Sequence, residues 1–420
     1  MRRLYTLLLW LALPFASAVV AWRGLADRRY WQGWSARFGV APRSSGGGVW
    51  VHAVSVGEVQ AAVALLGALQ AAQPERALWL SSATPAGRAR AREALGAEVA
   101  VSYAPYDLPW AVRAALRRFR PALLIVVETE IWPNLLAECA RAGVPVLFAS
   151  ARVSERSTRR YQRFPGLVRP ALAAVVTIAA QSTADAARFV RLGVPAQRAI
   201  VCGNIKFDRT IDTELTTRGA LLRARYAAGR FLWVAGSTHP GEERAAIAAH
   251  AQLLELQPAV LVLAPRHAPR FEEVATLLRT QGMRFVRRSE PQAEASAADV
   301  VLLDTIGELS DFYAAADLAF VGGSLVGVGG HNLLEPAQLG VAILTGPHQF
   351  NAPEVLLALR EAHAVRIVAN AAELAAAVSA LAGDASARAA LGEAGRAAVA
   401  ANRGALTRVL ALVKPLLAGR

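Results

Sequence analysis

Short apolar runs that alternate with helix-like segments constrain the fold of this 420-residue chain more than any other feature. Each run is apolar throughout, which is typical of strands that a parallel sheet buries on both faces. The runs are Val49–Val54, Leu78–Ser82, Leu123–Val127, Val144–Ala149, Val175–Ala180, Phe231–Ala235, Val260–Leu263, Val300–Leu303, Leu318–Val321 and Val341–Leu344. The Ala-, Leu- and Arg-rich stretches between them predict covering helices, so we expect an α/β fold.

The runs form two sets, and a polar stretch of low strand propensity separates them. A chain of this length is too long for one compact core. We therefore expect two Rossmann-like domains that face each other across a cleft. Residues 44–208 would form the first domain, 209–229 a linker and 230–420 the second, with an alanine-rich tail from Ala371 onward that predicts terminal helices.

Residues 1–43 predict a membrane anchor followed by an interfacial segment. The stretch from Leu4 to Trp22 is almost entirely apolar, and its length is close to the ~20 residues that cross a bilayer. Arginines mixed with Trp and Tyr follow it, which suits a headgroup layer and favours a cytoplasmic main body. These arginines are Arg23, Arg28, Arg29, Arg37 and Arg43.

Two other interpretations of this segment stay open. The tripeptide Ala16-Ser17-Ala18 resembles the cleavage site of a signal peptide, although the positive flank after the apolar run argues against export. A buried core helix would be apolar as well. Pro14 is compatible with a helix that enters one leaflet without crossing, so the pattern predicts attachment to a membrane without fixing the path of the helix.

The chain is strongly basic, with a formal net charge of +14. A basic chain implies an anionic partner, such as an acidic lipid or a phosphorylated substrate. The sequence has no basic-aromatic recognition motif, so we expect no nucleic acid partner. The two cysteines, Cys139 and Cys202, lack metal-ligand spacing, and we expect a reducing compartment.

Polar residues that follow the apolar runs are the candidates for a site, because ligands bind beyond the carboxyl ends of parallel strands. Glu58 begins a helix, where it is either a capping acid with a pKa lowered by the helix dipole or a general base. Glu128 and Glu130 follow a buried strand and either pair with arginines or stabilise charge in the cleft. Lys206 is one of two lysines among 46 basic residues, which indicates a compact cation unless it is an ordinary surface residue.

The second half of the chain carries small, hydroxyl and glycine residues after its apolar runs. These are Ser237, Thr238 and His239, then Arg266, the segment Asp304–Leu309, the loop Gly322–Leu325 and the turn Gly329–Pro336. Backbone N–H groups of such glycine-rich loops approach phosphates, and Glu335 would accept the hydroxyls of a ribose. Together they predict a nucleotide site.

Several nucleotide-binding classes are excluded by their missing motifs. The chain has no Walker A motif, and no GxGxxG follows its first strand, which argues against a kinase or a dinucleotide dehydrogenase. No DxD-like acid pair precedes the glycine loops, so we expect no divalent metal. Arg266, Lys206 and helix dipoles would then offset the charge of a leaving phosphate.

Eight motifs, taken in their order along the chain, carry a family resemblance. They are HAVSVGE, ETEIWPN, GNIKFD, GSTHPGEE, APRH, DTIGEL, GGSL and GGHNLLEP. Over nearly the whole chain they resemble the 3-deoxy-D-manno-octulosonic acid (Kdo) transferases of Gram-negative lipid A biosynthesis. The resemblance implies a metal-independent, cofactor-free, inverting glycosyltransferase of GT-B fold. It would transfer Kdo from CMP-Kdo to lipid IVA, the tetraacyl-disaccharide bisphosphate precursor of lipid A, at the cytoplasmic face of the bacterial inner membrane.

The resemblance also implies roles for particular residues. It identifies Glu58 as the general base, and Glu128 and Lys206 as groups that stabilise the transition state. The first domain would bind the acceptor and the second the CMP-sugar. Its expected CMP contacts are Pro265, Arg266, Ile306, Gly307, Glu308, Asn332, Leu333, Leu334 and Glu335. Four further residues join this set only by their position at a strand end or in a glycine-rich turn, namely Ser237, Thr238, His239 and Gly330.

Three other functions fit parts of the pattern. A GT-B enzyme that uses a UDP-sugar and another lipid acceptor would share most of these features, because spacing alone does not separate CMP from UDP. A GT-B-like sugar-nucleotide epimerase would share the fold but would have no need of a membrane anchor. A non-catalytic membrane scaffold would share the anchor but would have no need of Glu58.

Overall fold

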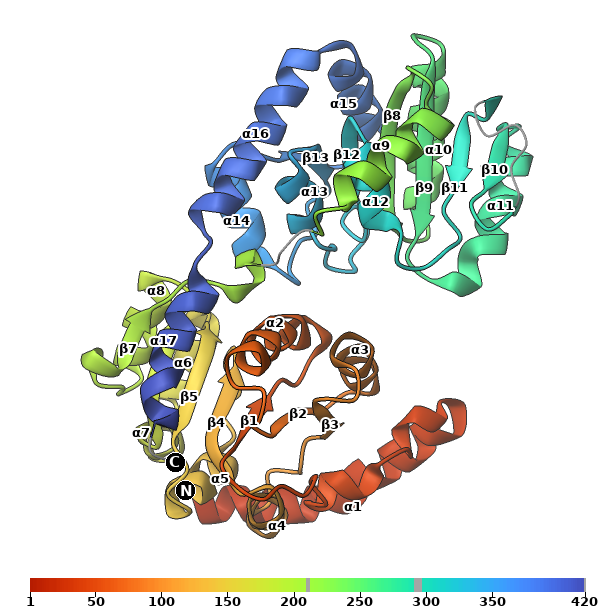
Figure 1. Cartoon of the computed structure of the whole chain (residues 1–420). Coiled ribbons are helices and arrows are strands. Elements are labelled where there is room, and N and C mark those ends of the chain that lie inside the picture. The colour runs from red at the N-terminus through yellow and green to blue at the C-terminus, as the bar shows by residue number, and fades with distance from the viewer. Residues whose placement is uncertain (209–211, 291–296, 419–420) are drawn as a thin grey trace. The chain divides into compact units, whose positions relative to one another are not determined.

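The computed structural model describes residues 1–208, 212–290 and 297–418. The chain divides into two compact units, one formed by residues 1–209 with 402–420 and the other by residues 210–401. Each unit is built on its own seven-stranded parallel sheet, which Figure 1 shows with helices on both faces. This confirms the predicted α/β fold with two Rossmann-like sheets.

The first unit has the strand order β3-β2-β1-β4-β5-β6-β7. Its strands are β1 (Gly48–His52), β2 (Leu78–Ser82), β3 (Ala100–Tyr103), β4 (Pro121–Val127), β5 (Val146–Ala151), β6 (Val175–Ala180) and β7 (Ala199–Val201). Its helices are α1 (Arg2–Ala26), α2 (Val56–Ala72), α3 (Pro85–Leu95), α4 (Pro109–Phe119), α5 (Pro133–Arg141), α6 (Glu155–Gln162), α7 (Pro165–Ala173), α8 (Thr183–Arg191) and α17 (Ala405–Leu417), with 3-10 turns η1 (Arg28–Tyr30), η2 (Trp34–Phe38), η3 (Ala196–Arg198) and η4 (Ile205–Asp208).

The second unit has the strand order β10-β11-β9-β8-β12-β13-β14. Its strands are β8 (Phe231–Thr238), β9 (Ala259–Pro265), β10 (Phe285–Arg287), β11 (Val300–Leu302), β12 (Leu318–Val321), β13 (Ala342–Thr345) and β14 (Arg366–Ile367). Its helices are α9 (Leu215–Tyr226), α10 (Glu242–Leu254), α11 (Phe271–Thr280), α12 (Leu309–Ala315), α13 (Leu334–Leu339), α14 (Pro353–Glu361), α15 (Ala371–Gly383) and α16 (Ala385–Ala401), with the 3-10 turn η5 (Ala268–Arg270).

Successive residues of the central strands face opposite cores, as the two-residue period of a strand requires. In the first unit, Ile125 packs with α2 and α17 on one face of the sheet. Its neighbour Leu124 packs with α4 and α5 on the other face. A strand buried on both faces is apolar at every position, which explains why the central strands appear as continuous apolar runs.

Each sheet has a topological switch point, where the chain leaves two neighbouring strands in opposite directions across the sheet. It lies between β1 and β4 in the first unit and between β8 and β12 in the second. The carboxyl ends of such strand pairs open a crevice in which open α/β sheets bind ligands. The loops after these four strands therefore decide where a site can form.

The chain is divided differently from the predicted boundaries in two places. Part of the predicted linker, residues 209–211, lies outside the described residues, but the rest contains α9, which packs on α12 of the second unit. Arg218 pairs with Asp311 at 3.0 Å, and Gly219 brings the two helices together because a side chain there would meet the backbone of Ala314. The last helix, α17, belongs to the first unit, since Asp208 accepts hydrogen bonds from the start of that helix and its apolar face joins the first core.

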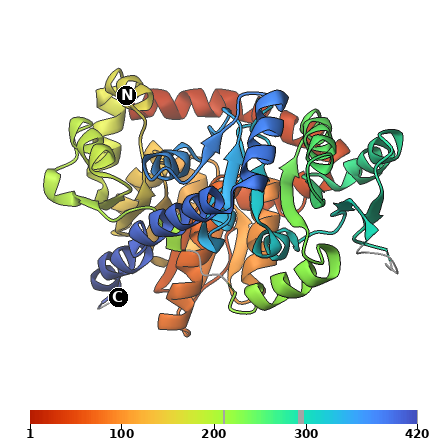
Figure 2. The ribbon, with the colours of Figure 1, turned by 90° about the horizontal axis from the view of Figure 1, so that it is seen from above.

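The apolar N-terminal helix α1 runs alongside the first unit, as Figures 1 and 2 both show. The hydroxyl of Tyr5 donates to Asp107 at 2.9 Å, and the rings of Trp10 and Trp110 lie 6.1 Å apart. At the other end, Trp31 donates to the carbonyl of Ala21. Helix α1 has a mean hydropathy of 2.0 over 18 residues and is long enough to cross a bilayer.

Candidate functional site

Glu58 lies in the first turn of α2, shortly after β1, at the switch point of the first sheet. Ser55 caps α2 by accepting the N–H of Glu58 at 3.3 Å. The Glu58 carboxylate in turn accepts the N–H of Val54 and the hydroxyl of Ser55, both at 2.7 Å. This arrangement is a variant of the capping box in which Glu58 reaches the N–H of Val54 in place of that of Ser55, so the capping role predicted as one alternative is present in the structure.

The pKa of Glu58 is raised overall, contrary to the lowering expected at a helix N-terminus. The side chain is buried, and this burial raises its pKa to about 7, assisted by the charges of Glu130 and Glu128 and opposed by the hydrogen bonds from Ser55 and Val54. Burial outweighs the helix dipole because the charged form of the carboxyl loses its water. A carboxyl with this pKa can take up and release a proton near neutral pH.

Glu128 follows β4 on the other side of the same switch point. One carboxylate oxygen contacts Nζ of Lys206 at 2.9 Å, and the other accepts from Nε of Arg152 at 2.9 Å. Burial alone would raise the pKa of Glu128, but these two cations hold it below its usual value. The buried charge that sequence reasoning flagged is therefore compensated by two side chains that are distant in sequence.

Glu130 completes an acidic group at this edge of the sheet. It accepts from Nε1 of Trp132 at 2.7 Å, and burial followed by the charge of Glu128 raises its pKa. Since the charges of Glu128 and Glu130 also act on Glu58, the structure brings the three acids together with Lys206. The pKa values of the two glutamates after β4 shift in opposite directions, because Glu128 has two cationic partners and Glu130 has none among the described residues.

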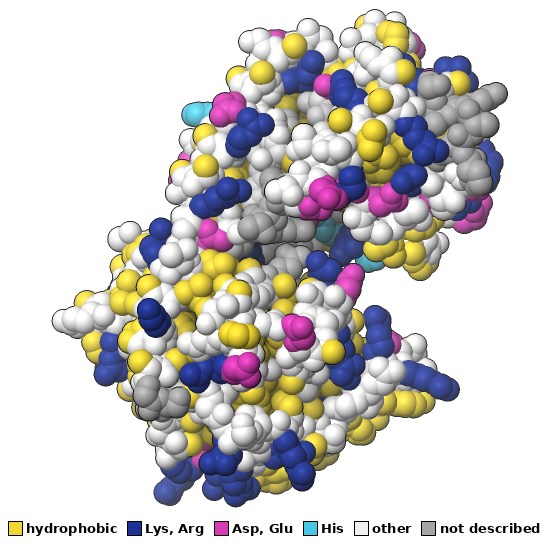
Figure 3. Space-filling model, viewed as in Figure 1, with side chains coloured by type: hydrophobic (Ala, Val, Ile, Leu, Met, Phe, Trp, Pro, Cys, Tyr) yellow, Lys and Arg dark blue, Asp and Glu magenta, His cyan; other side chains and the backbone are white. Residues whose placement is uncertain are grey.

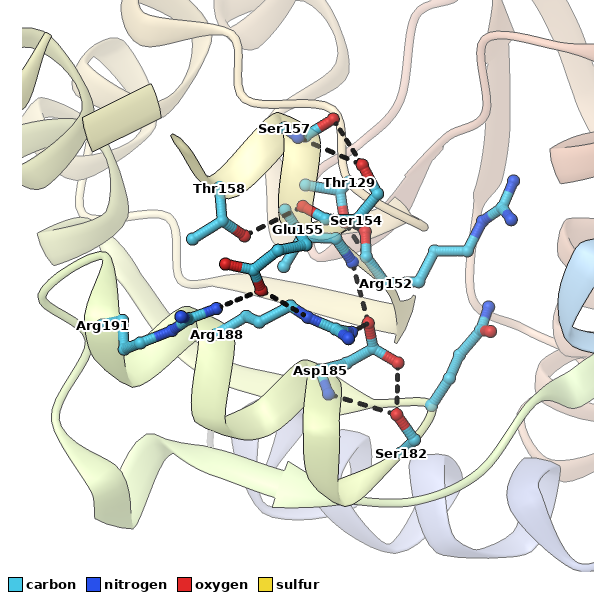
Figure 4. A network of polar contacts seen from close by, with 12 residues as sticks. Thr129, Arg152, Ser154, Glu155, Ser157, Thr158, Ser182, Asp185, Arg188 and Arg191 are labelled. Atoms are coloured by element: carbon cyan, nitrogen blue, oxygen red, sulfur yellow. Dashed lines mark hydrogen bonds and ion pairs between the residues drawn. The ribbon is translucent and has the colours of Figure 1, made fainter. Parts of the chain in front are cut away.

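A polar network fixes the segment that carries Arg152, as Figure 4 shows. Asp185 accepts the N–H of Val153 at 3.0 Å, and its other oxygen accepts from the hydroxyl of Ser182 at 2.5 Å. Arg188 contacts both Asp185 and Glu155. The network ties the end of β5 to α8, so Arg152 reaches Glu128 from a rigid support.

The candidate nucleotide residues of the second unit gather after β8, β9 and β12. Arg266 follows β9, is exposed, and its N–H donates to the carbonyl of Thr238. Nε2 of His239 and Nε2 of His331 lie 2.9 Å apart, so one ring donates to the other. Burial and then the nearby cations and histidines lower the pKa of His331 to about 4. The cluster brings two histidine rings and one exposed arginine to this edge of the sheet.

Backbone N–H groups of the glycine-rich loops donate to other groups of the protein. The N–H groups of Gly323, Ser324 and Leu325 donate to the carboxylate of Glu242. Those of Gly329 and Gly330 donate to the carbonyl of Gly323. These five amides already have acceptors within the protein, and the phosphate contact of the turn Gly329–Pro336 stays a prediction.

Other predicted nucleotide residues lie after β11, around the start of α13 and at the end of β8. Glu335 accepts from Asn332 at 3.1 Å and from the hydroxyl of Ser310 at 3.2 Å. Glu308 is paired with Arg288, and Ile306 is 84% exposed. Thr238 is fully buried with its hydroxyl toward the carbonyl of Ala264. Leu333 and Leu334 are buried as well. Thr238, Leu333 and Leu334 would therefore contact a nucleotide through their backbone atoms, or hold in place the residues that do.

Sequence reasoning missed four residues of these two sites. Arg152 follows β5 and Ser55 follows β1. Both could have been predicted, because ligands bind beyond the carboxyl ends of parallel strands. His331 and Glu242 lie inside motifs that were noted, but their partners come from distant segments. Within the described parts of the chain, no group of three or more His, Cys, Asp or Glu side chains is arranged to hold a metal ion.

Comparisons with known proteins agree on one family. The family model described as 3-deoxy-D-manno-octulosonic-acid transferase matches residues 32–209. The 3-deoxy-D-manno-octulosonic acid transferase of Haemophilus influenzae is 37% identical over 99% of both chains. That of Bordetella pertussis is 36% identical over 97% of this chain and 98% of its own.

Solved structures support the fold. The UDP-GlcNAc 2-epimerase of Neisseria meningitidis matches with a TM-score of 0.58 over 87% of this chain and 99% of its own, at 12% identity. MurG of Acinetobacter baumannii matches with a TM-score of 0.54 over the same shares, at 13% identity. At such low identity the likeness concerns the fold alone.

Proposed function

The chain belongs to the family of Kdo transferases and is therefore a glycosyltransferase, and we propose that it transfers Kdo from CMP-Kdo to lipid IVA with inversion of the anomeric centre. The observation that carries this proposal is the buried carboxyl of Glu58, whose pKa is raised to about 7 at the switch point of the first sheet. Such a group suits the removal of a proton from an acceptor hydroxyl.

The proposed reaction is a single displacement. Glu58 takes the proton of the acceptor hydroxyl while the hydroxyl oxygen bonds to the anomeric carbon of Kdo. The bond from that carbon to the phosphate oxygen of CMP breaks, and CMP leaves with the electron pair. The N–H of Val54 and the hydroxyl of Ser55 orient the carboxylate throughout. Attack opposite the leaving group inverts the anomeric configuration.

Glu128 and Lys206 form the second proposed element of the site. Their contact at 2.9 Å holds a positive and a negative charge in fixed positions beside Glu58. Fixed charges stabilise a transition state because they do not have to reorient as charge develops. The pair would therefore act on the reacting sugar electrostatically, without taking part in proton transfer.

The proposed donor site is the carboxyl edge of the second sheet. Arg266 is exposed there and would offset the negative charge of the CMP phosphate. Asn332 and Glu335 are held together by a hydrogen bond and would bind the ribose hydroxyls. No step in this site calls for a metal ion or another cofactor, and we propose that the reaction proceeds without either.

The proposed acceptor carries acyl chains, which requires contact with a membrane. Figure 3 shows basic and apolar side chains intermixed along the edge of the first unit where α1 runs. The apolar side chains of α1 that are exposed include Leu7, Leu11, Phe15, Trp22 and Leu25. We propose that they enter the cytoplasmic leaflet of the inner membrane.

The docking of α1 favours a helix that lies in one leaflet over a helix that spans the bilayer. The first half of α1 contacts Asp107 and Trp110 through Tyr5 and Trp10, and near its end Ala21 contacts Trp31 of the segment that follows the helix. A spanning helix would have to break the contacts of Tyr5 and Trp10. Maleimide labelling of Arg3→Cys in intact spheroplasts tests this, because only a spanning helix would expose the new thiol to the outer solution.

Transfer itself is tested with purified protein, CMP-Kdo and lipid IVA, with the products identified by mass spectrometry. The expected product is lipid IVA that carries Kdo. A parallel reaction with UDP-sugars covers the nearest alternative. Activity with a UDP-sugar and none with CMP-Kdo would overturn the proposal.

A further inference from the structure

The carboxylate of Glu242, the first residue of α10, is buried beneath the loop that follows β12. Only 1% of the residue is exposed. One carboxylate oxygen accepts the N–H of His239 at 3.0 Å and that of Gly323 at 2.7 Å. The other accepts the N–H groups of Ser324 and Leu325, both at 2.9 Å. Four backbone donors therefore converge on one side chain.

Converging backbone N–H groups at the end of a sheet form an anion-binding concavity. In this unit the concavity lies at the switch point between β8 and β12, where a ligand phosphate was expected. A side chain at Gly322 would lie 2.8 Å from the Glu242 carboxylate and 2.9 Å from the carbonyl of Ser237, so the position accepts only glycine. The protein thus fills its own anion site.

The loop that Glu242 holds supports the surrounding turns. The carbonyl of Gly323 accepts the N–H groups of Gly329 and Gly330, which lead into the segment of Asn332 and Glu335. The hydroxyl oxygen of Ser324 accepts the N–H of Gly346 at 2.8 Å. Every turn in this chain of contacts depends on the position of the loop 322–325.

Glu242 also controls the paired histidine rings. It fixes the backbone of His239 directly, and the ring of His331 packs against Gly323. The two rings are nearly parallel, with centroids 5.1 Å apart. A shift of the loop would separate their nitrogen atoms, because the same Glu242 oxygen holds the backbone of His239 and that of Gly323, against which His331 packs.

We propose that Glu242 is a positioning residue for the donor nucleotide. It acts as a resident anion that holds the loop 322–325, and through this loop the Gly329–Gly330 turn and the His239–His331 pair, without touching the nucleotide. The inference rests on the proposed function, since the ligand is taken to be a cytidine nucleotide. In this proposal, Arg266 and the His239–His331 pair bind the phosphate of the nucleotide.

The substitution Glu242→Gln tests the proposal. The amide keeps the shape of the side chain but presents an NH2 group to backbone donors, which leaves buried N–H groups without an acceptor. We expect the dissociation constant for CMP and the KM for CMP-Kdo to rise by about 10-fold or more, as the loss of hydrogen bonds to a charged group predicts. The KM for lipid IVA should stay within about 2-fold of the wild-type value.

Glu243→Gln is the matched control. Glu243 is equally buried, follows Glu242 in α10 and pairs with Arg270, not with the glycine loop. It should lose stability to a similar degree while its affinity for CMP stays within about 2-fold. The proposal is overturned if Glu242→Gln binds CMP normally, or if both variants lose affinity equally.

Hydrogen exchange on the unmodified protein keeps the test decisive if Glu242→Gln does not fold. The amides of Gly323, Ser324 and Leu325 should exchange slowly without nucleotide, and CMP should not slow them further. New protection of these three amides on CMP binding would overturn the proposal, because it would show that they bind the ligand. If the wild-type protein does not bind CMP, the proposed function itself is contradicted.

Discussion

The switch points of the two sheets hold a glutamate in equivalent positions but in opposite environments. Glu58 lies in the first turn of the helix after β1, and Glu242 is the first residue of the helix after β8. Glu58 accepts one backbone N–H and one hydroxyl, whereas Glu242 accepts four backbone N–H groups. Both are buried, so the difference lies in the number and kind of donors.

This difference teaches that surroundings, and not residue type, assign the role of a buried carboxyl. With few donors, burial dominates and raises the pKa of Glu58 to about 7, which leaves a group able to exchange a proton. With four amide donors, the Glu242 carboxylate is a fixed structural anion. One unit therefore uses its switch point for proposed chemistry, and the other uses it to hold its own loops.

The largest expected effect comes from Glu58→Gln. The amide retains the size of the side chain but cannot take up a proton, so kcat should fall by about 10³-fold. CMP affinity and the unfolding midpoint should remain near the wild-type values. Single-turnover assays measure the rate, and titration calorimetry measures the affinity. A near-normal kcat in Glu58→Gln would show that Glu58 is not the proton acceptor, and its role would then not differ from that of Glu242.

The pH dependence of transfer should follow the ionisation of Glu58. Since its pKa is raised to about 7, the rate should increase as pH rises through that value, and the increase should disappear in Glu58→Gln. The contribution of Glu58 to the stability of the fold changes with pH in the opposite direction to the rate. A folded-state pKa above the usual 4.5 favours the folded protein fully below pH 4.5, and this contribution is lost as pH rises through about 7. Rate and unfolding profiles from pH 5 to 9 measure both.

Lys206→Met tests whether side-chain cations compensate the acids of the first unit. Glu128 would keep Arg152 but lose one of its two cations, so its pKa should rise and the free energy of unfolding should fall by about 3 kcal/mol. Lys414→Met alters the other lysine, which is exposed on α17, and should change neither stability nor rate. Urea unfolding of both variants decides the matter. Equal stability of the two would show that the buried pair contributes little.

Arg266→Ala addresses the charge that the second unit offers to a phosphate. The loss of one charged hydrogen bond should weaken CMP binding by about 1–3 kcal/mol. Arg244→Ala, an exposed arginine on α10, serves as the control and should bind CMP normally. Calorimetric affinities for both variants measure the effect. An unchanged affinity in Arg266→Ala would leave the phosphate without its proposed cation.

Ser55→Ala should have the smallest effect and the most specific one. The loss of a helix cap costs about 1 kcal/mol of stability. Because the Ser55 hydrogen bond lowers the pKa of Glu58, its removal should also move the midpoint of the pH–rate profile upward. Ser154→Ala removes the cap of α6 and should cost similar stability without moving that midpoint. If the midpoint of the pH–rate profile does not move in Ser55→Ala, the profile does not report the ionisation of Glu58.

The central strands were predictable because they are buried on both faces. The four strands that the sequence did not reveal, β3, β7, β10 and β14, are the edges of the two sheets. They have four residues or fewer, and most of their side chains are partly exposed. An edge strand has a neighbour on one side only, so its residues need not be continuously apolar.

The candidate site was predictable in its positions but not in its partners. The strand-end rule located Glu58, Glu128 and Lys206, because that rule depends only on where strands stop. The contact of Lys206 with Glu128, and that of Glu242 with the loop after β12, depend on which strands are neighbours. Strand order is not a local property of the sequence, so the contact of Glu242 with the loop 322–325 could not be predicted.

The return of α17 to the first unit has a consequence for biosynthesis. The second unit is inserted within the first, so the ribosome completes it before the final helix emerges. Until then, the positions that Val409, Val413 and Leu417 occupy in the first core remain open. A message truncated after codon 209 would encode a first unit without its closing helix, and neither folding nor maturation of that unit can be complete before α17 has been synthesised.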